Sequence, residues 1–132
     1  MKPRLDITPA RVQKIVRRWL REFGMDRMWD LGVRVHRSDA AVPEEYRDAL
    51  AYAFVRDGTF LGTIDVCAHN FTATTSLEEV VAHEVTHVLL WRLQEIAKAA
   101  AGERLHPVVD AEVESVVETL SRVFGRLGRG AK

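Results

Sequence analysis

One pentapeptide, at residues 83–87, constrains this chain more than any other stretch, and it reads HEVTH. It lies within residues 76–101, where apolar residues recur at helical spacing and nothing interrupts a helix before Gly102. On a helix, side chains four positions apart leave the same face, about 40° apart around the axis. The two imidazoles can therefore reach one metal ion. Such an ion would also offset the cost of burying a charged His-Glu pair among Val and Leu.

The start of this helix is marked by Ser76 and Glu79, which stand in the S-x-x-E spacing of a capping box. An H-E-x-x-H sequence on a helix is typical of zinc peptidases, in which the metal lowers the pKa of a bound water towards ~7 and the glutamate takes its proton. The sequence therefore predicts one zinc ion per chain, with His83 and His87 as ligands. It predicts Glu84 as the catalytic base.

The other segments predict a single α+β domain over residues 1–132, with a small antiparallel or mixed sheet. Thr8 and Pro9 begin an N-terminal helix, which Gly24 ends. Alternating residues 31–37 predict one strand, and residues 49–56 and 60–68 predict two more, joined by a hairpin at Asp57-Gly58. Residues 43–46 predict a turn or one helical turn. A second long helix is expected over residues 108–127, and residues 128–132 are expected to form a frayed basic tail.

Composition is that of a soluble globular domain, with 47% apolar and 29% charged residues. The single cysteine, Cys67, excludes an internal disulfide, and we expect it to be a buried strand residue. No long apolar run or signal peptide is present, so a cytoplasmic protein with no membrane partner is expected. Residues 1–37 carry ten Lys/Arg against four Asp/Glu, and residues 38–118 carry five against fifteen. We interpret this as solvated terminal helices beside an acidic metal-binding cleft, and we do not expect nucleic acid as a partner.

A third metal ligand is needed, because catalytic zinc usually has three protein ligands and one open position. The lengthened pattern H-E-x-x-H-x-x-G-x-x-H is excluded by Leu90 and Leu93. Four acidic residues of the second helix are candidates: Asp110, Glu112, Glu114 and Glu118. We take the apolar stripe of that helix to be Val109, Val113, Val116, Val117, Leu120 and Phe124. Helical phase then favours Asp110 or Glu112, each about 80° from the centre of the stripe, over Glu114 at about 120° and Glu118 on the opposite side.

A resemblance adds to this reading. Residues 114–120 read ESVVETL, and with the H-E-x-x-H helix they resemble the small, single-domain zinc metallopeptidases of the gluzincin type found in phages and mobile elements. The chain is also similar to the catalytic domain of repressor-cleaving peptidases. The similarity covers residues 60–124 and is concentrated in the two helices. It implies a zincin-like fold in which the C-terminal helix carries the third ligand, and it places that ligand at Glu114.

Two further histidines, His106 and His69, are weaker candidates for the site. His106 is similar to the third histidine of the SprT-like DNA–protein crosslink proteases, although Pro107 stands where those proteins have glycine and their additional cysteines are missing. His69 follows a predicted strand and could donate a hydrogen bond to a tetrahedral oxyanion, but an ordinary loop histidine is the simpler interpretation. His36 is expected to be structural or solvated.

These observations predict a zinc-dependent peptidase whose peptide or protein substrate binds as an extended strand along the edge of the strand at residues 60–68. The alternatives are a three-histidine protease using His106 and a catalytically silent, metal-stabilised binding module of a phage or toxin–antitoxin system. Glu84 favours catalysis, because a purely structural metal site needs no general base.

Overall fold

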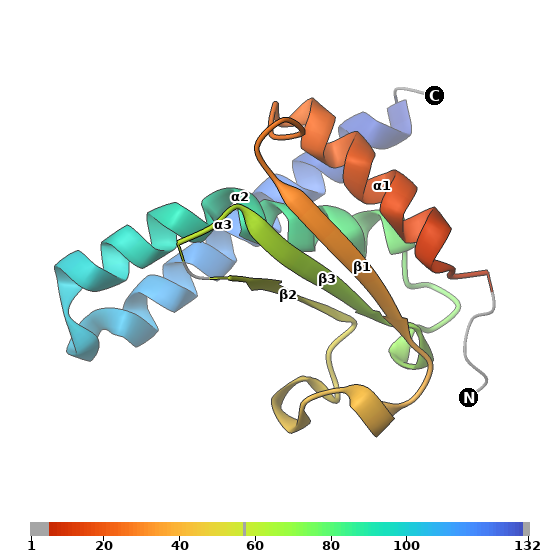
Figure 1. Cartoon of the computed structure of the whole chain (residues 1–132), viewed down its shortest axis with the longest axis horizontal. Helices are drawn as coiled ribbons and strands as arrows, with labels where there is room; N and C mark the ends of the chain where they lie inside the picture. Colours follow the sequence, from red (N-terminus) through yellow and green to blue (C-terminus); the bar gives the residue numbers. More distant parts are fainter. Residues whose placement is uncertain (1–5, 57, 131–132) are drawn as a thin grey trace.

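The computed structural model describes residues 6–56 and 58–130 (Figure 1). Within these residues the long helices are α1 (Pro9–Glu22), α2 (Leu77–Ala101) and α3 (His106–Gly130). The strands are β1 (Asp30–His36), β2 (Ala51–Val55) and β3 (Leu61–Cys67). Short 3-10 turns are η1 (Asp39–Ala41), η2 (Glu44–Tyr46), η3 (Ala68–Asn70) and η4 (Glu103–Leu105). The prediction of an α+β fold with a small mixed sheet is confirmed.

The strand order in the sheet is β1-β3-β2. Strand β3 is central, because it pairs in parallel with β1 and antiparallel with β2. The predicted hairpin is therefore present, although Asp57 in its turn lies outside the described residues. The prediction that residues 60–68 offer a free edge is wrong. The hairpin occupies one side of β3 and β1 returns to occupy the other, and the sequence alone does not reveal that second pairing.

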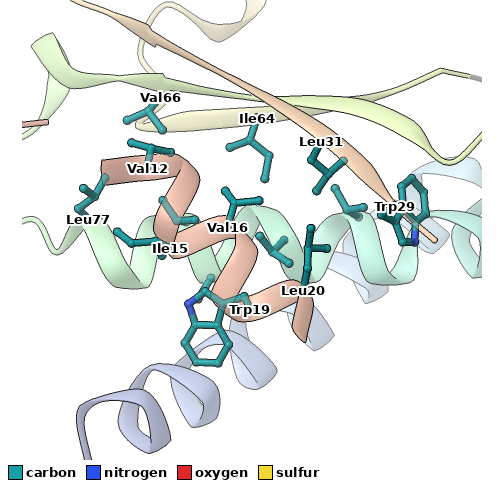
Figure 2. Close-up of a cluster of buried hydrophobic side chains, with 14 of the residues drawn as sticks. Val12, Ile15, Val16, Trp19, Leu20, Trp29, Leu31, Ile64, Val66 and Leu77 are labelled. Atoms are coloured by element: carbon teal, nitrogen blue, oxygen red, sulfur yellow. The ribbon is translucent and has the colours of Figure 1, made fainter. Parts of the chain in front are cut away.

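One face of the sheet packs on α1 and α2 and forms the main core (Figure 2). Helix α1 begins as predicted, with the Thr8 hydroxyl accepting a hydrogen bond from the Arg11 amide at 3.2 Å. It ends as predicted too, since Gly24 adopts a positive φ of 68° just past the last turn. The apolar side of α1 faces the sheet, and its buried residues are Val12, Ile15, Val16, Trp19 and Leu20.

The other face of the sheet holds the fully buried carboxylate of Asp65 together with a small apolar cluster of Val42, Tyr52 and Cys67. Arg34 Nε lies 2.9 Å and His36 Nε2 2.8 Å from Asp65 Oδ1, and the Thr63 hydroxyl donates to its Oδ2 at 3.2 Å. His36 is therefore structural, as expected. Cys67 is buried at the end of β3, and burial foremost raises the pKa of its thiol to about 11, as suits an unreactive strand residue.

Helices α2 and α3 form an antiparallel hairpin. The Ser76 hydroxyl accepts from the Glu79 amide at 3.3 Å and caps α2, as predicted. Gly102, with φ of 78°, ends α2 and turns the chain through η4 into α3. Helix α3 begins two residues earlier than expected and continues through residues 128–130, so these three residues are helical. Residues 131–132, the rest of the expected frayed tail, lie outside the described residues. Isolated glycines weaken a helix without stopping it.

No helix in the described part of the chain combines the length and the apolar character that crossing a membrane requires.

The close contact between β3 and its neighbours at Gly62 gives a stability prediction. A Cβ at position 62 would lie 2.5 Å from the Phe54 carbonyl oxygen and 3.2 Å from Leu31 Cδ2. Gly62→Ala should therefore lower the free energy of unfolding by about 1–3 kcal/mol, the usual cost of overpacking. Gly32→Ala on neighbouring β1 is the matched control, since its Cβ would meet no atom closer than 3.7 Å. Urea unfolding measures both, and equal losses would contradict the steric explanation.

Candidate metal centre

Helix α2 places His83 and His87 one turn apart on the side that faces α3. Their ring centroids lie 4.9 Å apart with an angle of 67° between the rings. Their side chains are 26% and 23% exposed, so both imidazoles are held by their surroundings and remain accessible. This is the paired arrangement that the i, i+4 spacing predicts.

Glu114 reaches these histidines from α3. Its Oε1 lies 3.1 Å from His83 Nε2 and its Oε2 lies 3.0 Å from His87 Nε2. One ligand atom from each of the three residues lies within 4.8 Å of the other two, so the cluster could hold a metal ion. Donors bound tetrahedrally at zinc distances lie about 3.3 Å apart, so a small adjustment would admit the ion. The three residues predicted as ligands are thus brought together.

The expected centre of the apolar stripe of α3 is wrong, which explains why helical phase favours Glu112 over Glu114; Asp110 does lie on the side that faces α2, but at another level of the helix. Val116, expected in the core, is 45% exposed, whereas Val117 is fully buried and Ser121 is 7% exposed. The side chain of Phe124, also counted in the stripe, lies outside those the structure describes. Measured from Val117, Glu114 is about 60° around the helix, which brings it to the side facing α2.

The other acidic candidates lie elsewhere. Asp110 does face α2, but its Oδ1 lies 2.8 Å from Gln94 Nε2 and 3.0 Å from Lys98 Nζ, about two helical turns beyond His87. The hydrogen bond from Lys98 is the main reason that the pKa of Asp110 is lowered. Glu112 is exposed and has no ion pair within the described residues. Glu118 lies 3.9 Å from Arg122 Nη2.

The remaining histidines do not join the cluster. His106 places its Nε2 3.0 Å from the Lys98 carbonyl oxygen, and so it caps the end of α2 at the tip of the hairpin. His69 places its Nε2 2.7 Å from Asp39 Oδ1 and its Nδ1 3.3 Å from the His36 carbonyl oxygen. It is an ordinary loop histidine with its own partners.

Glu84 is the most unusual group of the site. It is 7% exposed, and no hydrogen bond or ion pair within the described residues holds its carboxylate. Burial foremost, and then the negative charge of Glu114, raise the pKa of Glu84 to about 8. A buried carboxylate without a partner destabilises the fold, and such groups concentrate at functional sites.

A cavity of about 510 Å³ opens beside His83 and Glu84. Its walls come from the first turns of α2, the start of β2 and the middle of α3, with Leu50, Val80, Glu118, Ser121 and Arg122 among the lining residues. Apart from Glu118, which the sequence singles out as a candidate ligand, no sequence signal marks the wall residues of β2 and α3. They converge from segments far apart in the chain.

No family model, curated protein or solved structure matches this chain. The chemistry of the site therefore follows from its donor set. Two imidazoles and one carboxylate suit zinc, and they also suit other divalent transition metals.

Removing Glu114 tests the ligand set. Glu114→Ala leaves two protein ligands, so zinc affinity should fall by more than the ~10–100-fold typical of groups that only orient a ligand. Glu112→Ala is the matched control on the same helix and should leave the affinity unchanged. Competition with a chromophoric chelator measures both, together with His106→Ala. Normal binding by Glu114→Ala, with loss in either of the others, would show that the ligand was misassigned.

The raised pKa of Glu84 predicts a pH effect in the metal-free protein. The carboxyl titrates near 4.5 when unfolded and near 8 when folded, so between these values the folded state holds a proton that the unfolded state has released. Stability should therefore fall as the pH rises through this range. Glu84→Gln should lose less free energy of unfolding between about pH 5 and pH 8 than the unsubstituted protein. Urea unfolding in the presence of a chelator is the measurement, and parallel curves would refute the assignment.

Proposed function

We propose that the protein is a zinc-dependent peptidase of the zincin-like, gluzincin type. The observation that carries the proposal is the unpartnered, buried carboxylate of Glu84 beside the cluster of His83, His87 and Glu114. A site built only for stability would pair or remove that carboxylate, because burying it alone is costly.

His83, His87 and Glu114 would hold the zinc ion. Bound there, zinc supplies Lewis acidity, which polarises the scissile carbonyl and lowers the pKa of a water molecule. All three of these ligands belong to the hairpin of α2 and α3, so the packing of these two helices fixes the ligand geometry.

Glu84 would act as the general base and then as the general acid. It takes a proton from the attacking water as the oxygen of that water bonds to the carbonyl carbon. It then passes the proton to the amine nitrogen as the C–N bond breaks. Burial and the charge of Glu114 raise the pKa of Glu84 in the metal-free protein, and a bound zinc ion would lower it again, so that the carboxylate could both take and return a proton near neutral pH.

The substrate would lie along the outer edge of β2, rather than along β3 as the sequence suggested. The Cys67 amide donates to the Leu50 carbonyl and the Arg56 amide to the Leu61 carbonyl, so even-numbered residues of this strand face β3. Ala51 and Ala53 therefore direct their backbone groups outward, where an extended peptide can pair with them. The cavity beside Glu84 begins at Leu50 and Ala51 and would receive a substrate side chain.

The test is Glu84→Gln, assayed with zinc-loaded protein and a library of quenched fluorescent peptides. Zinc should remain bound at one ion per chain, and the hydrolysis rate should fall by about 10²–10⁴-fold because only the base is lost. Glu95→Gln, an exposed position farther along α2, is the control and should retain the full rate.

Hydrolysis by Glu84→Gln at the unsubstituted rate would show that the mechanism is wrong. Zinc binding by the unsubstituted protein without cleavage of any peptide in the library would favour the metal-stabilised binding module instead.

A further inference from the structure

Helix α1 carries three exposed cations on one side. Lys14, Arg17 and Arg21 follow each other at spacings of three and four residues, which places them on one face of the helix. None of them has an ion-pair partner in the part of the chain that the structure describes. Arg11, on the same helix, differs in that its Nη1 lies 2.9 Å from Asp6 Oδ2. The face therefore carries positive charge that the fold leaves uncompensated.

A groove of about 980 Å³ runs beside these cations, between α1 and the first residues of β1. Its apolar floor is formed by buried residues, namely Leu20, Trp29 and Leu31. Lys14, Arg17 and Arg21 form one wall, and Asp26, Asp30 and Gly32 lie along the other. The groove is thus lined by cations on the side of α1 and by two carboxylates on the side of the α1–β1 connection and the first residue of β1.

Strand β1 forms the side of this groove and is an outer strand of the sheet (Figure 1). The Asp30 amide donates to the Phe60 carbonyl at 2.9 Å, so Asp30 faces the sheet. Successive residues of a strand face alternate sides, and Leu31, Val33 and Val35 therefore direct their backbone groups to the open edge. In agreement, the Leu31 carbonyl accepts from Gln13 Nε2 of α1, at a long 3.5 Å.

We propose that the groove between α1 and β1 binds an acidic segment of a partner protein, held as an added strand on β1 with its carboxylates facing Lys14 and Arg17. The open backbone edge favours a polypeptide, because main-chain pairing needs alternating amides and carbonyls. Charge complementarity with the helix face makes that polypeptide acidic.

A nucleic acid fits this groove less well. Its phosphate backbone cannot form main-chain pairs with a strand edge. The acidic residues of the peptide must lie on the side of α1, beside Lys14 and Arg17, and not on the side of Asp26 and Asp30. The groove is on the opposite edge of the sheet from β2, so it does not depend on the proposed peptidase function.

The probe is an acetylated, amidated peptide of five Glu-Thr repeats with a fluorescent label, titrated with the full chain and followed by anisotropy. We expect saturable binding that weakens as salt is raised. The double variant Lys14→Glu with Arg17→Glu should bind at least about tenfold more weakly. Arg47→Glu with Arg56→Glu makes the same charge change at exposed positions away from the groove and should bind as the unsubstituted protein does.

Two N-methylated forms of the peptide separate strand pairing from simple charge attraction. One carries methyl groups on all Glu amides and the other on all Thr amides, so only one of them blocks the amides that face β1. One form should lose binding and the other should keep it. The proposal is wrong if the parent peptide does not bind, or if both methylated forms bind equally well. It is also wrong if the two double variants lose the same peptide affinity, or if a ten-residue thymidine oligonucleotide binds more tightly than the peptide.

Discussion

The site depends on one tertiary contact, the approach of Glu114 on α3 to His83 and His87 on α2. The two helices pack on each other, and their antiparallel arrangement fixes the level at which residues of one face residues of the other. The pairings of Asp110 with Gln94 and Lys98 set the same register nearer the tip of the hairpin. A shift by one turn, about 5.4 Å, would move Glu114 out of reach of both imidazoles.

This contact also affects the electrostatics of Glu84, the proposed base. Glu84 is buried against the sheet side of α2, and Glu114 adds a second negative charge close by, so the pKa of Glu84 rises. Two carboxylates held near each other without a compensating cation destabilise the fold. A bound divalent cation would relieve that repulsion, so metal binding and stability should be coupled at this site. The fold thus keeps an unfavourable arrangement at the proposed catalytic site, whereas it satisfies its other buried carboxylate, Asp65, with Arg34, His36 and Thr63.

Local signals in the sequence predicted most of the elements, because capping and turn residues act over a few positions. Thr8, Ser76 and Gly102 mark ends of helices where the sequence placed them. Long-range pairing was not predictable in this way. Nothing in residues 60–68 distinguishes a central strand from an edge strand, since the partner on the far side, β1, lies about thirty residues earlier.

The same contrast between local and long-range signals holds for the candidate site. The spacing of His83, Glu84 and His87 lies within one helix and was sufficient to predict their relation. The position of Glu114 depends on which side of α3 is buried, and the expectation that Val116 is core shifts that side far enough to favour Glu112 over Glu114. The motif pointed to Glu114, the residue that the structure brings to His83 and His87 in a cluster that could hold a metal ion.

Two open edges of the sheet now have different proposed roles. The β2 edge adjoins the cavity beside Glu84, and the β1 edge adjoins the cationic face of α1. A substrate protein could use both at once, although neither role requires the other.

The most direct test of the central claim is X-ray absorption at the zinc edge of the protein loaded with one equivalent of zinc. We expect four nitrogen or oxygen donors at about 2.0–2.2 Å, with the multiple-scattering signature of two imidazoles. A sulfur shell, a third imidazole, or six-coordinate oxygen ligation without imidazole would contradict a site made by His83, His87 and Glu114.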